Sequence, residues 1–193
     1  MSGMGATTFP RVGGHPAFDL VDTVHWRLDD TRAIDTLPDV EAVLDWCAEI
    51  DVIADPDALR ALASAAPATA TAEHAAITAL REAVYEAVFE ESPDAVALIA
   101  REHIDALSRS SLQRDGDRWR WHPPADLTGP RAAIALLAHD LLTSDLRAAR
   151  QCGDDACGWV YLDTSPRHNR IWCTAAGCGN RNRVKRHHAR SRD

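Results

Sequence analysis

Apolar residues recur every three or four positions through most of the first 150 residues of this chain. That spacing is typical of one face of an amphipathic helix. Proline also follows Asp55, Ser92 and Gly129, and it favours the first turn of a helix. The side chains of Asp55 and Ser92 can cap such a helix. Together these patterns predict helices over residues 39–50, 56–65, 72–91, 93–109 and 130–148.

A different pattern interrupts the helical one near residue 115. The turn residues Asp115-Gly116-Asp117 precede the alternating run Arg118-Trp119-Arg120-Trp121-His122, which predicts a short β-hairpin. The stretch 65–71 is rich in Ala, Pro and Thr, and we expect it to be a loop between two helices.

Four of the five cysteines form two matched pairs near the C-terminus. Cys152 pairs with Cys157 and Cys173 with Cys178, in the pattern C-x4-C-x15-C-x4-C. Four thiolates at this spacing predict a tetrahedral Zn²⁺ site, in which Cys152, Cys157, Cys173 and Cys178 are the ligands. Four protein ligands close such a site, so it would hold no activated water. Two disulfides are the alternative, which we disfavour because nothing in the sequence indicates secretion.

The residues around these cysteines contain few large apolar side chains. A structural zinc ion can contribute on the order of 10–16 kcal/mol of folding free energy, which a module this small needs. Trp159 and Trp172 are expected to form its small core, and glycines beside the cysteines are expected to allow turns with positive φ. A strand over 159–162 and a helix over 180–190 would give a treble-clef-like finger.

The predicted fold is therefore mainly α with a short β-hairpin, followed by a C-terminal treble-clef-like four-cysteine zinc finger. We divide the chain into a helical body, residues 1–149, and the finger, residues 150–193. The predicted helix over 130–148 ends just before Cys152, so we expect body and finger to be mechanically coupled.

Length and composition fit one ordinary domain with a small appendage, since the chain has 193 residues of which 46% are hydrophobic. We find neither a signal peptide nor an apolar run long enough to span a membrane. A soluble protein in a reducing cytoplasm is therefore expected.

Charge is unevenly distributed along the chain, whose net charge is −8. Residues 150–193 contain nine Lys or Arg and four Asp or Glu, a net charge of +5, which leaves −13 on the rest. A basic tail on an acidic body predicts binding of a polyanion, and the alternative is that the tail docks on the body itself. Arg150 or Arg170 could instead neutralise the charge of the zinc thiolates.

A basic helix over 180–190 would place arginine, lysine and histidine on nearly every face. We expect it to bind nucleic acid, with DNA favoured and RNA left open. Arg181 and Arg183 are the candidates to enter a groove, and Asn180 is expected to cap the helix. The predicted nucleic-acid contacts are Arg170, Arg181, Arg183, Lys185, Arg186, His187 and Arg190.

Two motifs resemble known families. Cys178-Gly179-Asn180-Arg181, after Trp172-Cys173, resembles the CGNR zinc finger, and the run from His15 to Thr23 resembles the opening of the ABATE domain that usually precedes it. The resemblance implies a bacterial stress-related transcription regulator whose finger binds DNA and whose ABATE domain senses a ligand. This chain has Asp22 where the ABATE opening commonly has Asn, and a carboxylate cannot donate a hydrogen bond as an amide does.

Within the body, the segment around residue 25 is the candidate site for a small-molecule effector. Asp19, Asp22 and His25 would share a helical face, but we expect them to be solvated rather than catalytic. The fold analogy suggests an effector site at Asp22, His25, Trp26 and Arg27. Cys47 is expected to be a buried apolar residue.

We find no nucleophile paired with a base and no phosphate-binding loop, so the chain is not expected to be an enzyme. The sequence thus favours a transcription regulator that binds nucleic acid through a zinc-stabilised basic helix. A zinc-stabilised protein-interaction module and a thiol-based redox sensor are the alternatives. A regulator that reads a palindrome would act as a homodimer.

Overall fold

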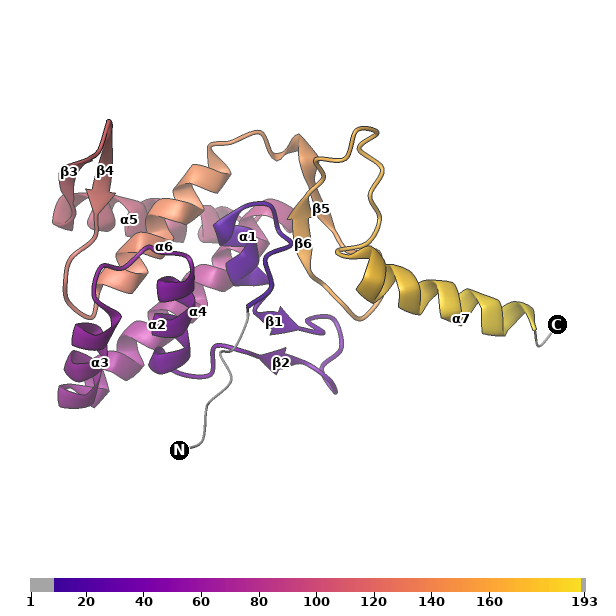
Figure 1. Ribbon diagram of the computed structural model, residues 1–193, viewed down its shortest axis with the longest axis horizontal. Helices are drawn as coiled ribbons and strands as arrows, with labels where there is room; N and C mark the ends of the chain where they lie inside the picture. Colours follow the sequence, from indigo (N-terminus) through magenta and orange to yellow (C-terminus); the bar gives the residue numbers. More distant parts are fainter. Residues whose placement is uncertain (1–8, 192–193) are drawn as a thin grey trace.

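The computed structural model describes residues 9–191 and shows a helical body with a small finger at one end (Figure 1). Three two-stranded antiparallel sheets, β1–β2, β3–β4 and β5–β6, lie around the helices of the described chain. The elements of the body are α1 (Pro16–Val21), β1 (Val24–His25), β2 (Ile34–Asp35), α2 (Val40–Glu49), α3 (Pro56–Ala65), α4 (Pro67–Phe89), α5 (Pro93–Arg109), β3 (Ser111–Asp115), β4 (Arg118–His122), α6 (Gly129–Leu142) and a 3₁₀ turn (Leu146–Ala148). The finger contains β5 (Ala149–Gln151), β6 (Val160–Leu162), a π-helical turn (Ala175–Gly179) and α7 (Asn180–Arg190).

Helix starts agree with the capping residues in the sequence. The side chains of Asp39, Asp55 and Ser92 each accept a hydrogen bond from a backbone N–H in the first turn of α2, α3 and α5. Proline occupies the first turn of α3, α5 and α6, where its missing N–H costs no helical hydrogen bond. The predicted helices are therefore present, with ends shifted by a few residues.

Two predicted boundaries are wrong. The stretch 65–71 is not a loop, because α3 ends at Ala65 and α4 begins at Pro67, with Ala66 between them. The same preference of proline for a helix start explains the difference. The helix predicted over 130–148 ends at Leu142, and Asp145 then caps the separate 3₁₀ turn.

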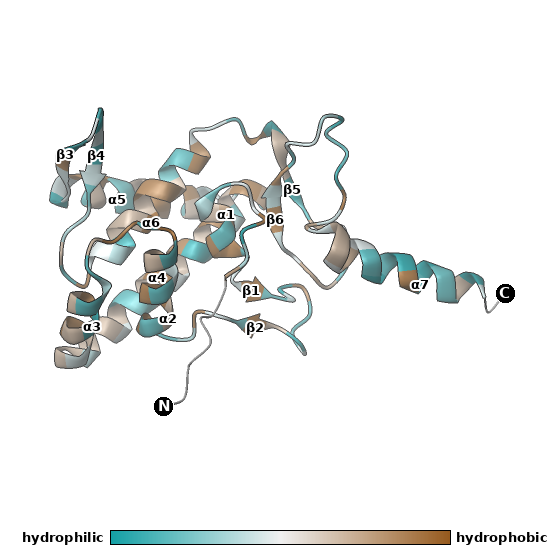
Figure 2. Cartoon of the chain, viewed as in Figure 1, coloured by the Kyte–Doolittle hydropathy of each residue, from teal (hydrophilic) through white to brown (hydrophobic). Residues whose placement is uncertain are grey.

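The core of the body lies between α4, α5 and α6, with α1 packed against α4 and α6 and with α2 against α4. Trp46, Phe18 and Leu80 are among its fully buried side chains. Cys47 is also buried there as an apolar residue, as predicted, and burial raises its pKa to about 12. In Figure 2 the apolar residues gather on the inner faces of these helices.

The predicted hairpin is present as β3 and β4. Leu112 pairs with Trp121 and Arg114 with Trp119, so these four side chains share one face. Both strands are exposed, and they lie at the end of the body opposite α7 (Figure 1).

The finger is joined to the body by more than the chain connection. Val160 in β6 belongs to the core of the body and is fully buried. The N–H of Val160 donates to Asp22 Oδ1 at 2.7 Å, and the N–H of Leu162 donates to the Gly13 carbonyl at 2.8 Å. The coupling expected from the short connection is thus built from hydrogen bonds that backbone N–H groups of β6 donate across the junction.

Candidate metal centre and basic helix

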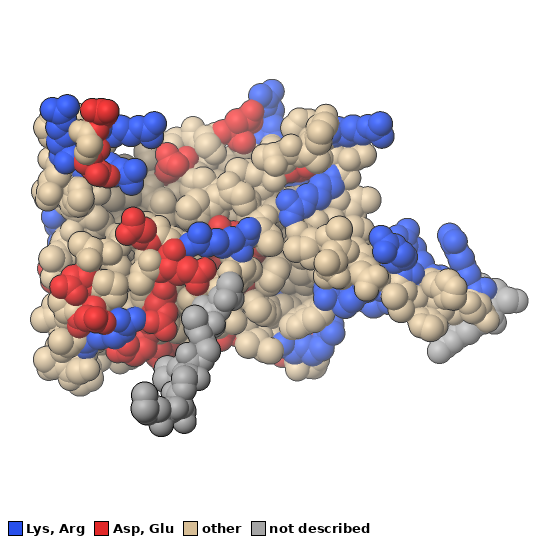
Figure 3. Space-filling view, viewed as in Figure 1, with Lys and Arg blue, Asp and Glu red and all other residues tan. Residues whose placement is uncertain are grey.

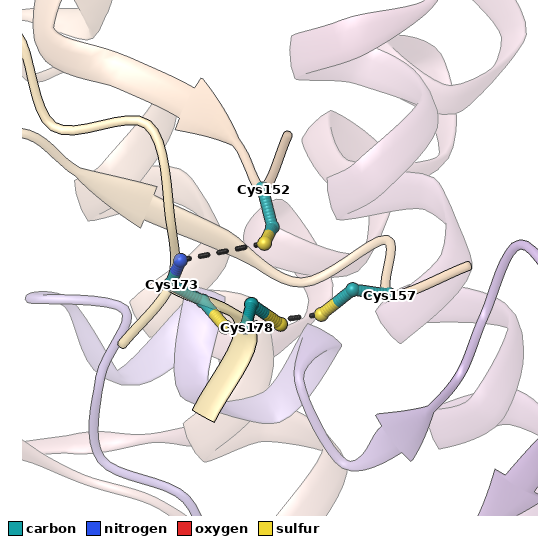
Figure 4. Close-up of side chains that lie close together, drawn as sticks. All are labelled: Cys152, Cys157, Cys173 and Cys178. Atoms are coloured by element: carbon teal, nitrogen blue, oxygen red, sulfur yellow. Dashed lines mark hydrogen bonds between the residues drawn. The ribbon is translucent and has the colours of Figure 1, made fainter. Parts of the chain in front are cut away.

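Four cysteine sulfurs meet in the finger, as the spacing of the cysteines predicts (Figure 4). The Sγ atoms of Cys152, Cys157, Cys173 and Cys178 all lie within 4.8 Å of one another, and all four residues are buried. Tetrahedral zinc with Zn–S bonds of about 2.3 Å requires sulfurs about 3.8 Å apart. The Cys157–Cys173 and Cys173–Cys178 distances are 3.8 and 3.4 Å, so small shifts would give that geometry.

Each pair of cysteines lies in a turn next to a regular element. Cys152 follows β5 and Cys157 precedes β6, while Cys178 lies in the π-helical turn that leads into α7. Within that turn, Thr174 Oγ1 accepts a hydrogen bond from the Gly177 N–H. The predicted order of knuckle, strand, knuckle and helix is therefore present.

The conformation of the glycines was predicted only in part. Of the glycines beside the cysteines, Gly158 has a positive φ, +69°. A Cβ at Gly158 would also lie 2.8 Å from Arg27 Cβ, so the first knuckle packs tightly on the body. Gly177 instead allows close approach, because a Cβ there would lie 2.5 Å from Thr174 Oγ1.

Packing four thiols together couples their protonation. Hydrogen bonds from the thiols of Cys157 and Cys173 favour the thiolate of Cys152 and lower its pKa to about 2. Donating a hydrogen bond to the Cys152 sulfur raises the pKa of Cys157 and of Cys173. Four thiolates can coexist here only beside a cation of high charge, which zinc supplies. Both the geometry and the donor set fit Zn²⁺ held by the four cysteines.

The cation that contacts the cluster is Arg181, not Arg150 or Arg170. A guanidinium nitrogen of Arg181 lies 2.8 Å from Cys178 Sγ, and its Nε lies 3.6 Å from the buried carboxylate of Asp154. Asn182 also donates to that carboxylate, at 2.6 Å. Arg181 follows Cys178 by three residues on a helical turn, a spacing that could have indicated this contact.

Arg170 has a structural place inside the finger. Its guanidinium lies 3.9 Å from the ring centroid of Tyr161 and donates to the backbone carbonyls of Trp172 and Cys173. Arg170 is therefore engaged internally, which does not support its predicted contact with nucleic acid. Arg150 donates to the carbonyls of Arg147 and Ala149, away from the sulfurs.

Aromatic residues complete the core of the finger, as predicted. Tyr161 is fully buried beside the cysteines, with Trp159 and Trp172 packed against the same cluster. The Tyr161 hydroxyl donates to the Arg170 carbonyl at 2.8 Å.

The four residues predicted to bind an effector have different environments. Asp22 is fully buried and accepts the Val160 N–H of the finger, whereas Arg27 forms an ion pair with Glu82 and donates to the Val21 carbonyl within the body. His25 and Trp26 lie instead at the junction with the finger, where burial lowers the pKa of His25. Asp19 accepts a hydrogen bond from the Gly13 N–H. The prediction that Asp19 and Asp22 are solvated is wrong, because both carboxylates bind backbone N–H groups in the interior.

Helix α7 projects away from the rest of the chain (Figure 1) and is hydrophilic along almost its whole length (Figure 2). Residues 183–191 are all exposed. Figure 3 shows lysine and arginine along this helix, whereas acidic side chains gather on the body. Within residues 9–191 no acidic side chain forms an ion pair with Arg183, Lys185, Arg186 or Arg190. This arrangement argues against docking of the basic helix on its own body.

Asn180 does not cap α7. The preceding residue is Gly179, in helical conformation, and no side chain accepts a hydrogen bond at this helix start. The reason is that the π-helical turn runs directly into α7, and Thr174 caps that turn instead.

Comparisons with known proteins agree with this architecture. A family model described as CGNR zinc finger matches residues 149–191. A second model, ABATE, described as "Putative stress-induced transcription regulator", matches residues 14–145, more than half of the chain. The chain belongs to the ABATE family. Its ABATE domain and CGNR finger follow one another in the order that the motifs predicted. No curated protein matches the sequence.

Within residues 9–191, the four cysteines are the one group of His, Cys, Asp or Glu side chains arranged to hold a metal ion. No helix in that range combines the length and the apolar character needed to cross a membrane.

Proposed function

We propose that this ABATE protein is a transcription regulator that binds DNA through α7, which the zinc centre fixes to the body. The observation that carries the proposal is the exposure of Arg183, Lys185, Arg186 and Arg190 on a projecting helix with no acidic partner in the described chain. The binding role needs no open metal position, and four cysteine ligands leave none. We therefore propose a binding function rather than an enzymatic one.

The contacts within the finger divide the basic residues of α7 into two groups. Arg181, in the first turn, is held by Cys178 and by Asp154, which also binds Asn182. The residues beyond them point into solvent, and His187 lies among them. Only this second group is available to phosphates, so Arg181 leaves the set of groove-entering candidates while Arg183 stays in it.

The salt dependence of binding tests the proposal. If Arg183, Lys185, Arg186 and Arg190 each neutralise one phosphate, the slope of log K against log salt should be about −3.6 on duplex DNA. The affinity should then fall roughly 150-fold between 50 and 200 mM salt. Fluorescence anisotropy with a labelled duplex of random sequence and zinc-loaded full-length protein measures both quantities.

A charge-matched pair of variants localises the interface. Replacing the four basic residues of α7 with alanine should abolish salt-sensitive binding. Replacing four exposed arginines elsewhere, Arg101, Arg114, Arg118 and Arg120, makes the same change in net charge and should leave binding within about two-fold. Equal losses in both variants would show that net charge alone attracts DNA and would refute an interface on α7.

A competition experiment separates DNA from an acidic protein partner. Unlabelled duplex DNA should displace the labelled duplex, whereas poly-glutamate at the same charge concentration should not. Displacement by both polymers with equal efficiency would favour the protein-interaction module. Parallel titration with duplex RNA tests the preference for DNA.

A further inference from the structure

The carboxylate of Asp154 lies where the surrounding charge is negative. Asp154 belongs to the first knuckle, between Cys152 and Cys157, and its side chain is 1% exposed. Four thiolates on one divalent ion would carry a formal charge of −2, so burial and the nearby sulfurs both disfavour an ionised group at this position. A buried carboxylate in such surroundings needs strong hydrogen-bond partners. The partners of Asp154 therefore indicate what the residue does.

Both oxygens of Asp154 are engaged, one within the knuckle and one across to α7. Oδ1 accepts the Ala156 N–H at 3.2 Å, which holds the turn between the first two cysteines. Oδ2 accepts a hydrogen bond from Asn182 Nδ2 at 2.6 Å and lies 3.6 Å from Arg181 Nε. Asn182 and Arg181 belong to the first turn of α7. One side chain thus joins the first knuckle to the helix that follows the second.

The amide of Asn182 has two acceptors, and both are fixed parts of the finger. Its Nδ2 donates to Asp154 Oδ2 and, at 3.1 Å, to the carbonyl of Cys178. An amide nitrogen carries two N–H donors, so both of them are used. Alanine or aspartate at this position could not form the bridge. Asn182 is therefore the counterpart of Asp154 on α7.

Almost all of α7 lies outside these contacts. The helix is exposed beyond its first turn, and in the described chain the hydrogen bonds and ion pairs from its side chains to other elements come from Arg181 and Asn182. The bond from Arg181 to Cys178 stays within the second knuckle, so Asp154 supplies the link to the first. Zinc would hold the start of the helix through Cys178, and one point of attachment does not by itself set the angle of a helix.

The length of α7 converts a small change of angle into a large displacement. Arg190 lies about 12 Å beyond Asn182 along a helix that rises about 1.5 Å per residue. A tilt of about 20° at the first turn would move Arg190 by about 4 Å, more than the spacing of about 3.4 Å between successive charges on one DNA strand. The exposed basic side chains would then face different phosphates.

We propose that Asp154 is a positioning residue for α7, which acts through Asn182 and contacts no DNA itself. Its carboxylate sets the angle at which the basic helix leaves the finger. Arg183, Lys185 and the basic residues that follow are thereby presented as a preformed surface, and a preorganised interface binds more tightly because less ordering is needed on binding. The effect on affinity rests on the DNA binding proposed above, whereas the effect on the helix angle does not.

Two neighbouring aspartates make a matched pair of variants. Asp155 is exposed and follows Asp154, so Asp154→Asn and Asp155→Asn change the net charge equally. Charge alone predicts that both variants bind DNA more tightly, by up to about two-fold, because each removes a negative charge near the basic helix. Positioning predicts the opposite for Asp154→Asn, a loss of affinity of about five- to ten-fold, because the amide replaces a charged acceptor of the Asn182 N–H.

Asn182→Ala removes the other half of the contact and should cause a loss of similar size. If Asp154 acts through Asn182, the double variant should bind DNA within about two-fold of the weaker single variant. Independent roles would instead multiply the two losses, to roughly 25-fold or more. Fluorescence anisotropy of zinc-loaded full-length proteins at one salt concentration measures these affinities. The zinc content and Tm of each variant check that the metal centre and the body are intact.

A measurement without DNA tests the helix angle directly. Residual dipolar couplings of backbone N–H groups report the direction of α7 relative to the body in ¹⁵N-labelled, zinc-loaded full-length protein. In the native protein and in Asp155→Asn, the couplings of α7 and of α4, α5 and α6 should fit one common alignment. In Asp154→Asn and Asn182→Ala, the couplings of α7 should shrink or depart from that fit, while those of the body stay unchanged.

Three results would overturn the proposal. These are tighter DNA binding by Asp154→Asn, multiplied losses in the double variant, and couplings of α7 that are the same in Asp154→Asn as in the native protein. If Asp154→Asn loses zinc, Asn182→Ala decides from the α7 side through its affinity and its couplings. A protein that binds no DNA but shows the expected change in couplings would refute the DNA binding and leave the positioning role standing, so the two failures are distinguishable.

Discussion

Replacing Asp22 with asparagine is expected to stabilise the protein at neutral pH. Asp22 is fully buried, and its Oδ1 accepts the Val160 N–H at 2.7 Å. Its Oδ2 has no hydrogen-bond partner among the described residues. An asparagine amide keeps the acceptor for Val160 and has almost the same volume, so the substitution removes an ionisable group without breaking the contact between body and finger.

The sign of the effect follows from the pKa of Asp22. Burial raises this pKa well above its usual value, and the nearby Asp19 and Cys152 add to the effect, whereas the Val160 N–H and Arg27 oppose it. A raised pKa means that the folded protein holds the proton more tightly than the unfolded chain. The wild-type protein therefore loses stability relative to the Asn variant as the pH rises above about 4, the pKa of an unfolded aspartate, until it passes the folded pKa.

The expected gain at pH 7 is on the order of 1–3 kcal/mol, because the amide avoids the cost of burying a carboxylate whose pKa is raised by desolvation, while both side chains leave one polar group unpaired. For a chain of this length, that corresponds to an increase in Tm of roughly 3–9 °C. The zinc thiolates lie close to Asp22, so their negative charge would push the gain toward the upper end of this range.

Urea unfolding between pH 5 and pH 8 measures this dependence. The zinc content must be determined at each pH, since protons compete with zinc for thiolates. Asp117→Asn, at an exposed position in the hairpin turn, is the matched control and should change stability by less than 0.5 kcal/mol at every pH. A gain that stays constant with pH, or a loss of stability at pH 7, would refute the reasoning, since either result means that Asp22 does not carry a raised pKa.

Two other perturbations test the finger. Removal of zinc with a chelator should lower the Tm of the whole protein in one cooperative transition, because Val160 in β6 belongs to the core of the body. Calorimetry measures this transition, and unfolding of the body at an unchanged Tm would contradict the expectation. Arg170→Ala should lower the free energy of unfolding in urea by about 2 kcal/mol, because it removes hydrogen bonds to two carbonyls and the contact with Tyr161. The same substitution should leave the slope of DNA affinity against salt concentration unchanged. Unchanged stability with a shallower slope would instead place Arg170 in the DNA interface.

The parts of the fold that the sequence predicted are those that depend on local chemistry. Helix starts at Asp55 and Ser92 follow from one capping side chain and one proline, and the four cysteines follow from their spacing. The start of α4 at Pro67 was predictable from the same proline preference, but the Ala, Pro and Thr content of that stretch outweighed it.

The parts that the sequence did not predict depend on contacts between distant residues. A surface position was expected for Asp22, yet its environment is set by Val160, which lies 138 residues away. Arg170 and Arg181 both counted as basic residues available to DNA, because charge pattern alone cannot show that Tyr161 and Cys178 engage them. Net charge thus predicted a basic region at the C-terminus of the chain, where α7 presents exposed basic side chains, but it could not show which of these residues are engaged within the finger.

The contacts at the junction bear on how a signal could travel between the two parts of this ABATE protein. The backbone N–H of Arg27 donates to the Cys157 carbonyl at 3.0 Å, and Trp26 packs on Arg181. One knuckle of the metal centre and the first turn of α7 therefore both rest on the same turn of the body. A zinc ion held by the four cysteines would make the two knuckles a single rigid unit, so that a movement of that turn by one or two ångströms would be transmitted to α7. Zinc would then serve as a mechanical joint as well as a source of folding energy.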